Sequence, residues 1–141
     1  MCAKMIESYG SNDLKARFAL PACDVALGVE KIATDILRSE AGPSGAAPAL
    51  LLVAPIPIIE TGLLGPMFEG GAEKSCRLAP LIADLAARLG ADFIDAGLHA
   101  AVDPVDGIHL DGSAHAALGA AFADAVEELF SMTLTGGNKR C

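Results

Sequence analysis

The chain has 141 residues, of which 52% are hydrophobic and 20% charged, so it can bury one core and is too apolar to be largely disordered. Its formal net charge of −8, with no basic run beyond Lys139-Arg140, disfavours nucleic acid and anionic membranes as partners. No signal peptide is visible, and the apolar run 46–59 is too short and too rich in proline to span a bilayer, so we expect a cytoplasmic protein.

A strand and a helix are expected in the first third of the chain. Residues 1–9 can form a short strand, although its polar side chains make it unsuited to the middle of a sheet. A helix is predicted from a cap at Asp24 to about Arg38, and residues 42–45 end it as a loop. The apolar stripe of this helix has helical spacing and consists of Val25, Val29, Ile32 and Ile36.

The middle of the chain predicts a buried strand, a long loop and a second helix. Residues 50–53 form a continuous apolar run, which is typical of a strand buried on both faces. Residues 55–71, with three prolines, are expected to form an irregular loop, and loops of this length are usually functional. The next helix is predicted over residues 72–89, before Gly90. Its buried stripe consists of Leu78, Ile82, Leu85 and Leu89.

The last third predicts a short strand over residues 92–95, a loop over 96–111 and a helix over about 113–130 that Asp111 caps. The buried face of this helix consists of Leu118, Phe122, Ala125 and Leu129. We therefore divide the chain into one domain, residues 1–130, and a frayed polar tail, residues 131–141.

This alternation of strands and helices predicts an α/β fold with a parallel sheet. In such sheets, functional loops gather at the carboxyl ends of the strands. The segments 10–13, 55–71 and 96–111 each follow a strand, so we expect them at one rim of the sheet.

An acid and a base stand three residues apart in the last of these loops, at Asp106 and His109. A histidine that acts as a general base needs a partner on its other ring nitrogen, which fixes the tautomer and stabilises the imidazolium. The carboxylate of Asp106 can be that partner if the turn is tight, and Gly107 permits a tight turn. For an isolated D-x-x-H sequence, a solvated aspartate and a histidine near a helix start remain the alternative.

A second candidate is the segment Gly10-Ser11-Asn12-Asp13. An asparagine at the rim can direct its side-chain amide at a developing oxyanion, although these four residue types are also common turn formers. In the long loop, Leu63-Leu64 and Met67-Phe68 either line an acyl pocket or cover the core.

Other chemistries have less support. The scattered cysteines Cys2, Cys23, Cys76 and Cys141 suggest buried or incidental thiols and no disulfide framework. The histidines and aspartates of residues 99–115 could be imagined as a metal cluster, but loop acids are the commoner explanation, and the spacing of a calcium loop is missing. Neither nucleotide-binding glycine motif is present, so no nucleotide cofactor is expected.

Taken together, these segments resemble the SGNH (GDSL) hydrolase family. The likeness is carried by Gly10-Ser11-Asn12-Asp13 and, much later, by Asp106-Gly107-Ile108-His109-Leu110. Residues 68–75 and 93–97 look like the bacterial arylesterase and acyltransferase members, and the likeness covers about residues 9–130.

The resemblance implies a flavodoxin-like three-layer α/β/α sandwich and the hydrolysis of a small-molecule ester through an acyl-serine. It implies that His109 is the base, Asp106 its acid and Asn12 an oxyanion donor, while Gly10 and Asp13 shape the turn that holds Asn12. No metal and no organic cofactor is needed for this chemistry.

The departures from the family are large, and they include Lys4, Glu7 and Ser8 in the strand before Gly10, which is normally apolar. The G-D-S motif that carries the nucleophile, and a second block with an oxyanion glycine, are both missing, so the chain resembles the C-terminal portion of such an enzyme. Ser8, Ser11 and Ser113 are weak substitutes, since none follows the pattern of an activated serine. We therefore expect a truncated esterase, and the alternatives are a catalytically silent domain or one that receives its serine from a second chain. Residues 1–9 would then form an open sheet edge prone to self-association or homo-oligomerisation.

Overall fold

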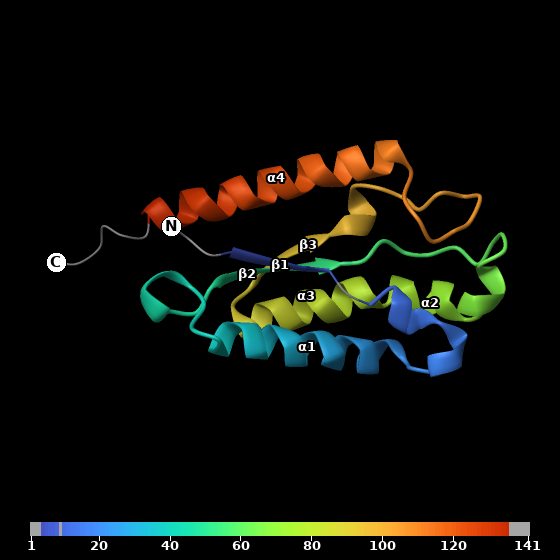
Figure 1. Ribbon diagram of the computed structural model, residues 1–141, viewed down its shortest axis with the longest axis horizontal. Helices are drawn as coiled ribbons and strands as arrows, with labels where there is room; N and C mark the ends of the chain where they lie inside the picture. Colours follow the sequence, from blue (N-terminus) through green and yellow to red (C-terminus); the bar gives the residue numbers. More distant parts are fainter. Residues whose placement is uncertain (1–3, 9, 136–141) are drawn as a thin grey trace.

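The computed structural model describes residues 4–8 and 10–135 (Figure 1). Its centre is a three-stranded parallel sheet of β1 (Lys4–Ser8), β2 (Ala49–Ala54) and β3 (Asp92–Asp95), in the order β1-β2-β3. The parallel sheet and its three strands confirm the predicted α/β class, and the layers correspond to an incomplete three-layer sandwich. Within the described ranges, no helix is both long enough and apolar enough to cross a membrane.

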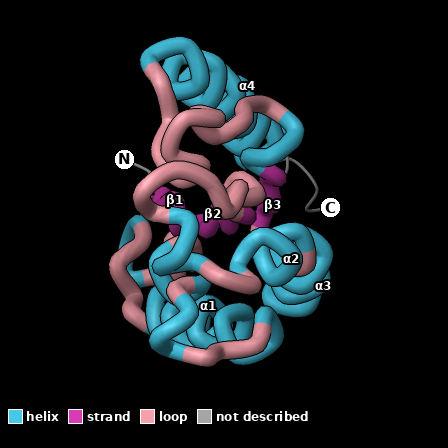
Figure 2. The backbone as a smooth tube through the Cα atoms, turned by 90° about the vertical axis from the view of Figure 1, so that its right-hand side faces the viewer, coloured by secondary structure: helices cyan, strands magenta, loops and turns pink. Residues whose placement is uncertain are grey.

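Helices cover both faces of the sheet (Figure 2). The helices α1 (Ala22–Arg38) and α3 (Leu78–Leu89) lie on one face, and α4 (Gly112–Thr135) lies on the other. Because side chains alternate along a strand, β2 contributes to two cores. One core packs against α1 and α3 and contains Leu50, Leu52 and Ala54 of β2, and the other packs against α4 and contains Leu51 and Val53. This double burial explains the unbroken apolar run of the strand.

The first helix differs from its prediction at its start and in its stripe. It begins at Ala22 after Pro21, which takes the N-cap position, so Asp24 is the third helical residue and does not cap the helix with its side chain. Ala33 is fully buried, whereas Ile32 is 40% exposed, because the buried stripe returns at residue 33 after Val29.

The helix predicted over residues 72–89 is two helices, α2 (Gly71–Cys76) and α3, which are separated at Arg77. Pro80 accounts for the break, because it has no amide hydrogen to donate to the Cys76 carbonyl and its ring would clash with that carbonyl in a continuous helix. The stripe itself is confirmed, with Leu78, Ile82 and Leu85 buried and Leu89 partly buried.

The last helix begins as predicted and ends later. The Asp111 carboxylate accepts a hydrogen bond from the Ala114 amide at 2.7 Å, which satisfies one free donor of the first turn. The helix continues to Thr135, so the predicted end at residue 130 is too early and residues 131–135 are not a frayed tail. Residues 136–141 lie outside the described part of the chain.

The loops that follow the strands meet at the carboxyl end of the sheet, on the right in Figure 1. They include three short 3-10 turns, Asn12–Leu14, Gly65–Phe68 and Ala96–Leu98. In the long loop, Phe68 is buried in the α1/α3 core whereas Leu63 is 97% exposed. Phe68 therefore covers the core, and neither it nor Leu63 lines the pocket described below.

Candidate active site

Asp106 and His109 are in direct contact. The Nδ1 atom of His109 lies 2.7 Å from Oδ2 of Asp106. The other carboxylate oxygen, Oδ1, accepts hydrogen bonds from the backbone amides of Ile108 and His109, each at 2.9 Å. Three donors thus hold the carboxylate in one orientation, which in turn fixes the imidazole ring.

The turn between the two residues is held from outside by the long loop. The amide of Ile59 donates to the carbonyl of Gly107 at 2.8 Å. Gly107 has a φ of +75°, and a Cβ at this position would overlap with the carbonyl oxygen of Ile59. Only glycine satisfies both the left-handed backbone and this close approach.

Asp103 closes the same loop from the other side. Its amide donates to the His109 carbonyl and its carbonyl accepts from the Gly107 amide, each at 2.7 Å. Its side chain accepts from the Val105 amide at 2.8 Å. The acid and base therefore stand in a loop whose backbone is paired along most of its length.

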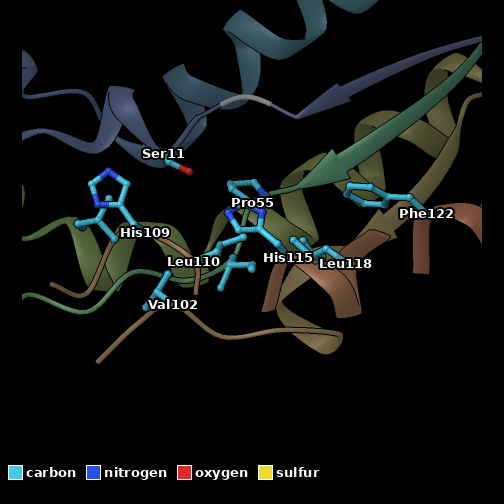
Figure 3. A pocket seen from close by; sticks show the side chains of 11 residues that line it. Ser11, Pro55, Val102, His109, Leu110, His115, Leu118 and Phe122 are labelled. Carbon is cyan, nitrogen blue, oxygen red and sulfur yellow. The ribbon is translucent and has the colours of Figure 1, made fainter. Parts of the chain in front are cut away.

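An apolar pocket of about 520 Å³ opens beside His109 (Figure 3). The loops after all three strands contribute to it, through Ser11, Pro55 and Ala96, and His109 lies at its edge. The remaining wall comes from α4, where His115, Leu118 and Phe122 recur at helical spacing. The three segments that were expected at one rim therefore do meet there.

Asn12 lies at this rim but is not among the residues that line the pocket. It is exposed, and its Oδ1 accepts a hydrogen bond from Lys15 Nζ at 2.8 Å. The turn before it forms as the sequence suggests, since the Gly10 carbonyl accepts the Asp13 amide at 3.1 Å and Gly10 has a φ of +122°. Buried Leu14 anchors the turn in the core.

Comparisons with known proteins find matches among solved structures. No family model and no curated protein matches the sequence. Among solved structures, the chain is similar to Est24, described as a carbohydrate acetylesterase from Sinorhizobium meliloti, with a TM-score of 0.84 and 35% identity over 89% of this chain and 60% of that one. It is also similar to the aryl esterase of M. smegmatis, with a TM-score of 0.83, 35% identity and the same two coverages. A protein assigned as an arylesterase from Agrobacterium tumefaciens has 42% identity and a TM-score of 0.78, again over 89% and 60% of the two chains.

These esterases are SGNH hydrolases, so the predicted resemblance to that family is confirmed. The chain spans about three-fifths of the length of these solved structures.

The hydrogen bonds to Asp106 hold its carboxyl group in the charged form. The amide donors of Ile108 and His109 and the His109 ring lower the pKa of Asp106 from its ordinary 3.8 to about 2. Asp111, at the start of α4, has a lowered pKa for a related reason, because the Ala114 amide and the Ser113 hydroxyl donate to its carboxylate.

This pKa predicts how the loop responds to acid. A carboxyl group whose pKa is lower in the folded state stabilises that state above its unfolded pKa, and this stabilisation disappears as the pH falls through the folded value. We expect Asp106 to contribute fully above about pH 4 and to lose its contribution between about pH 4 and 2. A ¹³C NMR titration of the Asp106 carboxyl carbon should give a midpoint near 2, and Asp106→Asn should flatten the acid dependence of unfolding in this window. A midpoint near 3.8 would mean that the donors are not engaged in solution.

The serines do not complete the site within the described residues. Ser11 lines the pocket but makes no hydrogen bond to His109, and Figure 3 shows its hydroxyl oxygen directed away from the imidazole. Ser113 donates to the Asp111 carboxylate at 2.7 Å, so its hydroxyl is engaged at the start of α4. The side chain of Ser8 lies outside the described part of the structure.

The residues described include no group of three or more His, Cys, Asp or Glu side chains that could hold a metal ion. Cys23 and Cys76 are free thiols and both are exposed, so neither is a buried thiol. Cys2 and Cys141 lie outside the described residues.

Sequence reasoning missed the residues that hold the acid–base loop, which is the segment 103–109 that contains Asp106 and His109. The Asp103-Pro104 pair is a turn signal that could have identified Asp103. Ile59 acts through its backbone, which leaves no signal in the sequence. The pocket side of α4 could have been suspected from the spacing of His115, Leu118 and Phe122, but only the fold shows which loops that face meets.

Proposed function

We propose that this chain supplies three functional groups of a serine ester hydrolase. His109 is the base, Asp106 is its acid and Asn12 is an oxyanion donor. The observation that carries the proposal is the 2.7 Å contact between His109 Nδ1 and Asp106 at the edge of an apolar pocket. An engaged Nδ1 leaves Nε2 as the ring nitrogen that faces a reacting group.

The proposed mechanism follows from these contacts. His109 Nε2 takes the proton of a serine hydroxyl as its oxygen attacks the ester carbonyl, and Asp106 stabilises the imidazolium that forms. The Asn12 side-chain oxygen is occupied by Lys15, so its NH₂ group is the part available to donate to the carbonyl oxygen as this becomes negative. The imidazolium then protonates the leaving alcohol, and water or another alcohol removes the acyl group from the serine.

We infer that the substrate is a small ester with a compact, apolar acyl or aryl group. The pocket walls beyond His109 are mainly apolar, with Val102, Leu110, Leu118 and Phe122 among them. The solved relatives are described as an acetylesterase and an aryl esterase, which agrees with a pocket of this character.

We infer further that the nucleophile is not one of the chain's own described serines, because none of them hydrogen-bonds His109. The chain by itself is then catalytically silent, and a segment that carries a G-D-S motif completes it. Loss of a nucleophile removes nearly all of the acceleration of such an enzyme and leaves only binding and oxyanion effects.

The test compares the chain alone with the chain co-expressed with a complementing segment, namely the part of the M. smegmatis aryl esterase that it does not match. We call the resulting complex the completed enzyme. We expect background hydrolysis of p-nitrophenyl acetate by the chain and by the segment separately, and rapid hydrolysis by the completed enzyme. Full activity of the chain alone, or a stable complex without activity, would contradict the proposal.

The outer edge of β1 suggests how a partner joins. Within the described sheet, β1 pairs with β2 alone and stands at the edge, where a strand exposes backbone groups that can pair with another chain. We expect the isolated chain to self-associate through this edge and the complementing segment to suppress the association. Sedimentation velocity measures both states, and a sharp monomer peak for the isolated chain would contradict this expectation.

A further inference from the structure

Ser75 is a buried polar side chain that the proposed chemistry does not use. It lies in α2, is 1% exposed, and is the one polar side chain in the buried class within the described residues. Its hydroxyl donates to the Ala72 carbonyl at 2.7 Å, a bond that many helical serines make. Its oxygen also accepts the Ile58 amide at 3.1 Å, which joins segments 17 residues apart.

The accepted amide belongs to the segment that holds the acid–base loop. Ile58 donates to Ser75, and the next amide, that of Ile59, donates to the Gly107 carbonyl at 2.8 Å. Pro57 has no amide hydrogen, so Ile58 is the first donor after it that can tie this segment to α2. Two successive amides therefore connect α2 to the turn between Asp106 and His109.

Residues 58–60 also make other contacts with α2. The Glu60 carboxylate accepts the Ala72 amide at 2.9 Å. A Cβ on Gly71 would come within 2.9 Å of Ile58 Cδ1 and 3.3 Å of the Leu14 carbonyl oxygen, so α2 packs closely on both the long loop and the turn that carries Asn12. One short helix thus touches the turn that carries Asn12 and the long loop that supports the turn between Asp106 and His109.

We propose that Ser75 is a positioning residue, whose hydroxyl fixes residues 58–59 and, through their contact with Gly107, the hydrogen bonds between Asp106 and His109. The proposal rests on the proposed roles of Asp106 and His109 for its functional meaning. Its structural content can be tested without any catalysis. Removal of the hydroxyl leaves the buried Ile58 amide without an acceptor, and the segment must move to satisfy it.

The test is amide hydrogen exchange of the isolated chain, combined with the titration of Asp106. In Ser75→Ala, we expect exchange at Ile108 and His109, the amides that donate to Asp106, to rise about tenfold, while amides of α1 change little. The midpoint of the Asp106 carboxyl should move upward from about 2 towards 3.8. Should Ser75→Ala fail to fold, Ser75→Cys, which keeps a weak acceptor, takes its place with the same criteria.

Two matched controls separate positioning from general loss of stability. Ser39 makes the same kind of bond to the carbonyl three residues earlier, at 2.6 Å to Ile36, but lies exposed after α1, so Ser39→Ala should leave residues 106–109 unchanged. Val29→Ala removes buried volume in α1 and should raise exchange throughout the core without moving the Asp106 midpoint.

An unchanged Asp106 midpoint together with unchanged exchange at Ile108 and His109 in the Ser75 variant would overturn the proposal. A rise in exchange that matches Val29→Ala at every amide would overturn it as well. Neither readout depends on ester hydrolysis, so a completed enzyme without activity would refute the proposed function and leave this result standing.

Discussion

Replacement of His109 by alanine in the completed enzyme is expected to lower the rate of ester hydrolysis by about 10⁴-fold or more. In the proposed mechanism, His109 takes the serine proton and returns it to the leaving group. Among the described residues, no other side chain hydrogen-bonds Asp106, so none can replace His109. The measurement is kcat for p-nitrophenyl acetate with purified completed enzyme.

His115→Ala is the matched control for this substitution. His115 lines the same pocket but stands on α4 and does not contact Asp106, so its removal should change KM more than kcat, within about tenfold. Equal losses of kcat in the two variants would show that the pocket needs an imidazole only for its shape.

Replacement of Gly107 by alanine is expected to destabilise the acid–base loop and the fold together, by roughly 3 kcal/mol. A side chain here must adopt a left-handed backbone at a φ of +75° and would also overlap with the Ile59 carbonyl. Since this contact joins the loop to the long loop, we expect the hydrogen bond between Asp106 and His109 to be lost as well. Urea unfolding and the Asp106 titration measure the two effects.

Gly70→Ala separates the two causes. Gly70 has nearly the same φ, +73°, but a Cβ there would meet only the end of the Lys74 side chain, at 4.0 Å. This variant should therefore show the backbone cost alone, about 1 kcal/mol. Equal destabilisation in the two variants would mean that the approach of Ile59 to Gly107 contributes nothing.

Much of the fold could be predicted because its signals are local. The unbroken apolar run of β2, the stripe of α3 and the Asp111 cap each depend on residues within one element. The errors arose where neighbouring residues compete. Pro80 divides a helix whose apolar pattern continues across the break. The spacing of apolar residues predicts that Ile32 is buried, but it is the neighbouring Ala33 that faces the core.

In the candidate site too, the local features could be predicted from the sequence and the long-range contacts could not. A spacing of three residues with a glycine between them was enough to predict the approach of Asp106 to His109, because a single turn brings them together. The supports of that turn were not predictable. Ile59 acts through its backbone, and Ser75 meets Ile58 only after α2 has packed against the long loop.

If His109 and Asp106 activate a serine that the described part of this chain does not contain, a serine-reactive phosphonate will label that serine only in the completed enzyme. Intact-mass analysis after exposure to the phosphonate, with peptide mapping of the labelled serine, measures this. We expect no label on the isolated chain, and in the completed enzyme a single label on the serine of the complementing segment that disappears with His109→Ala. Labelling of Ser11 in the isolated chain, or labelling of the completed enzyme that persists without His109, would contradict it.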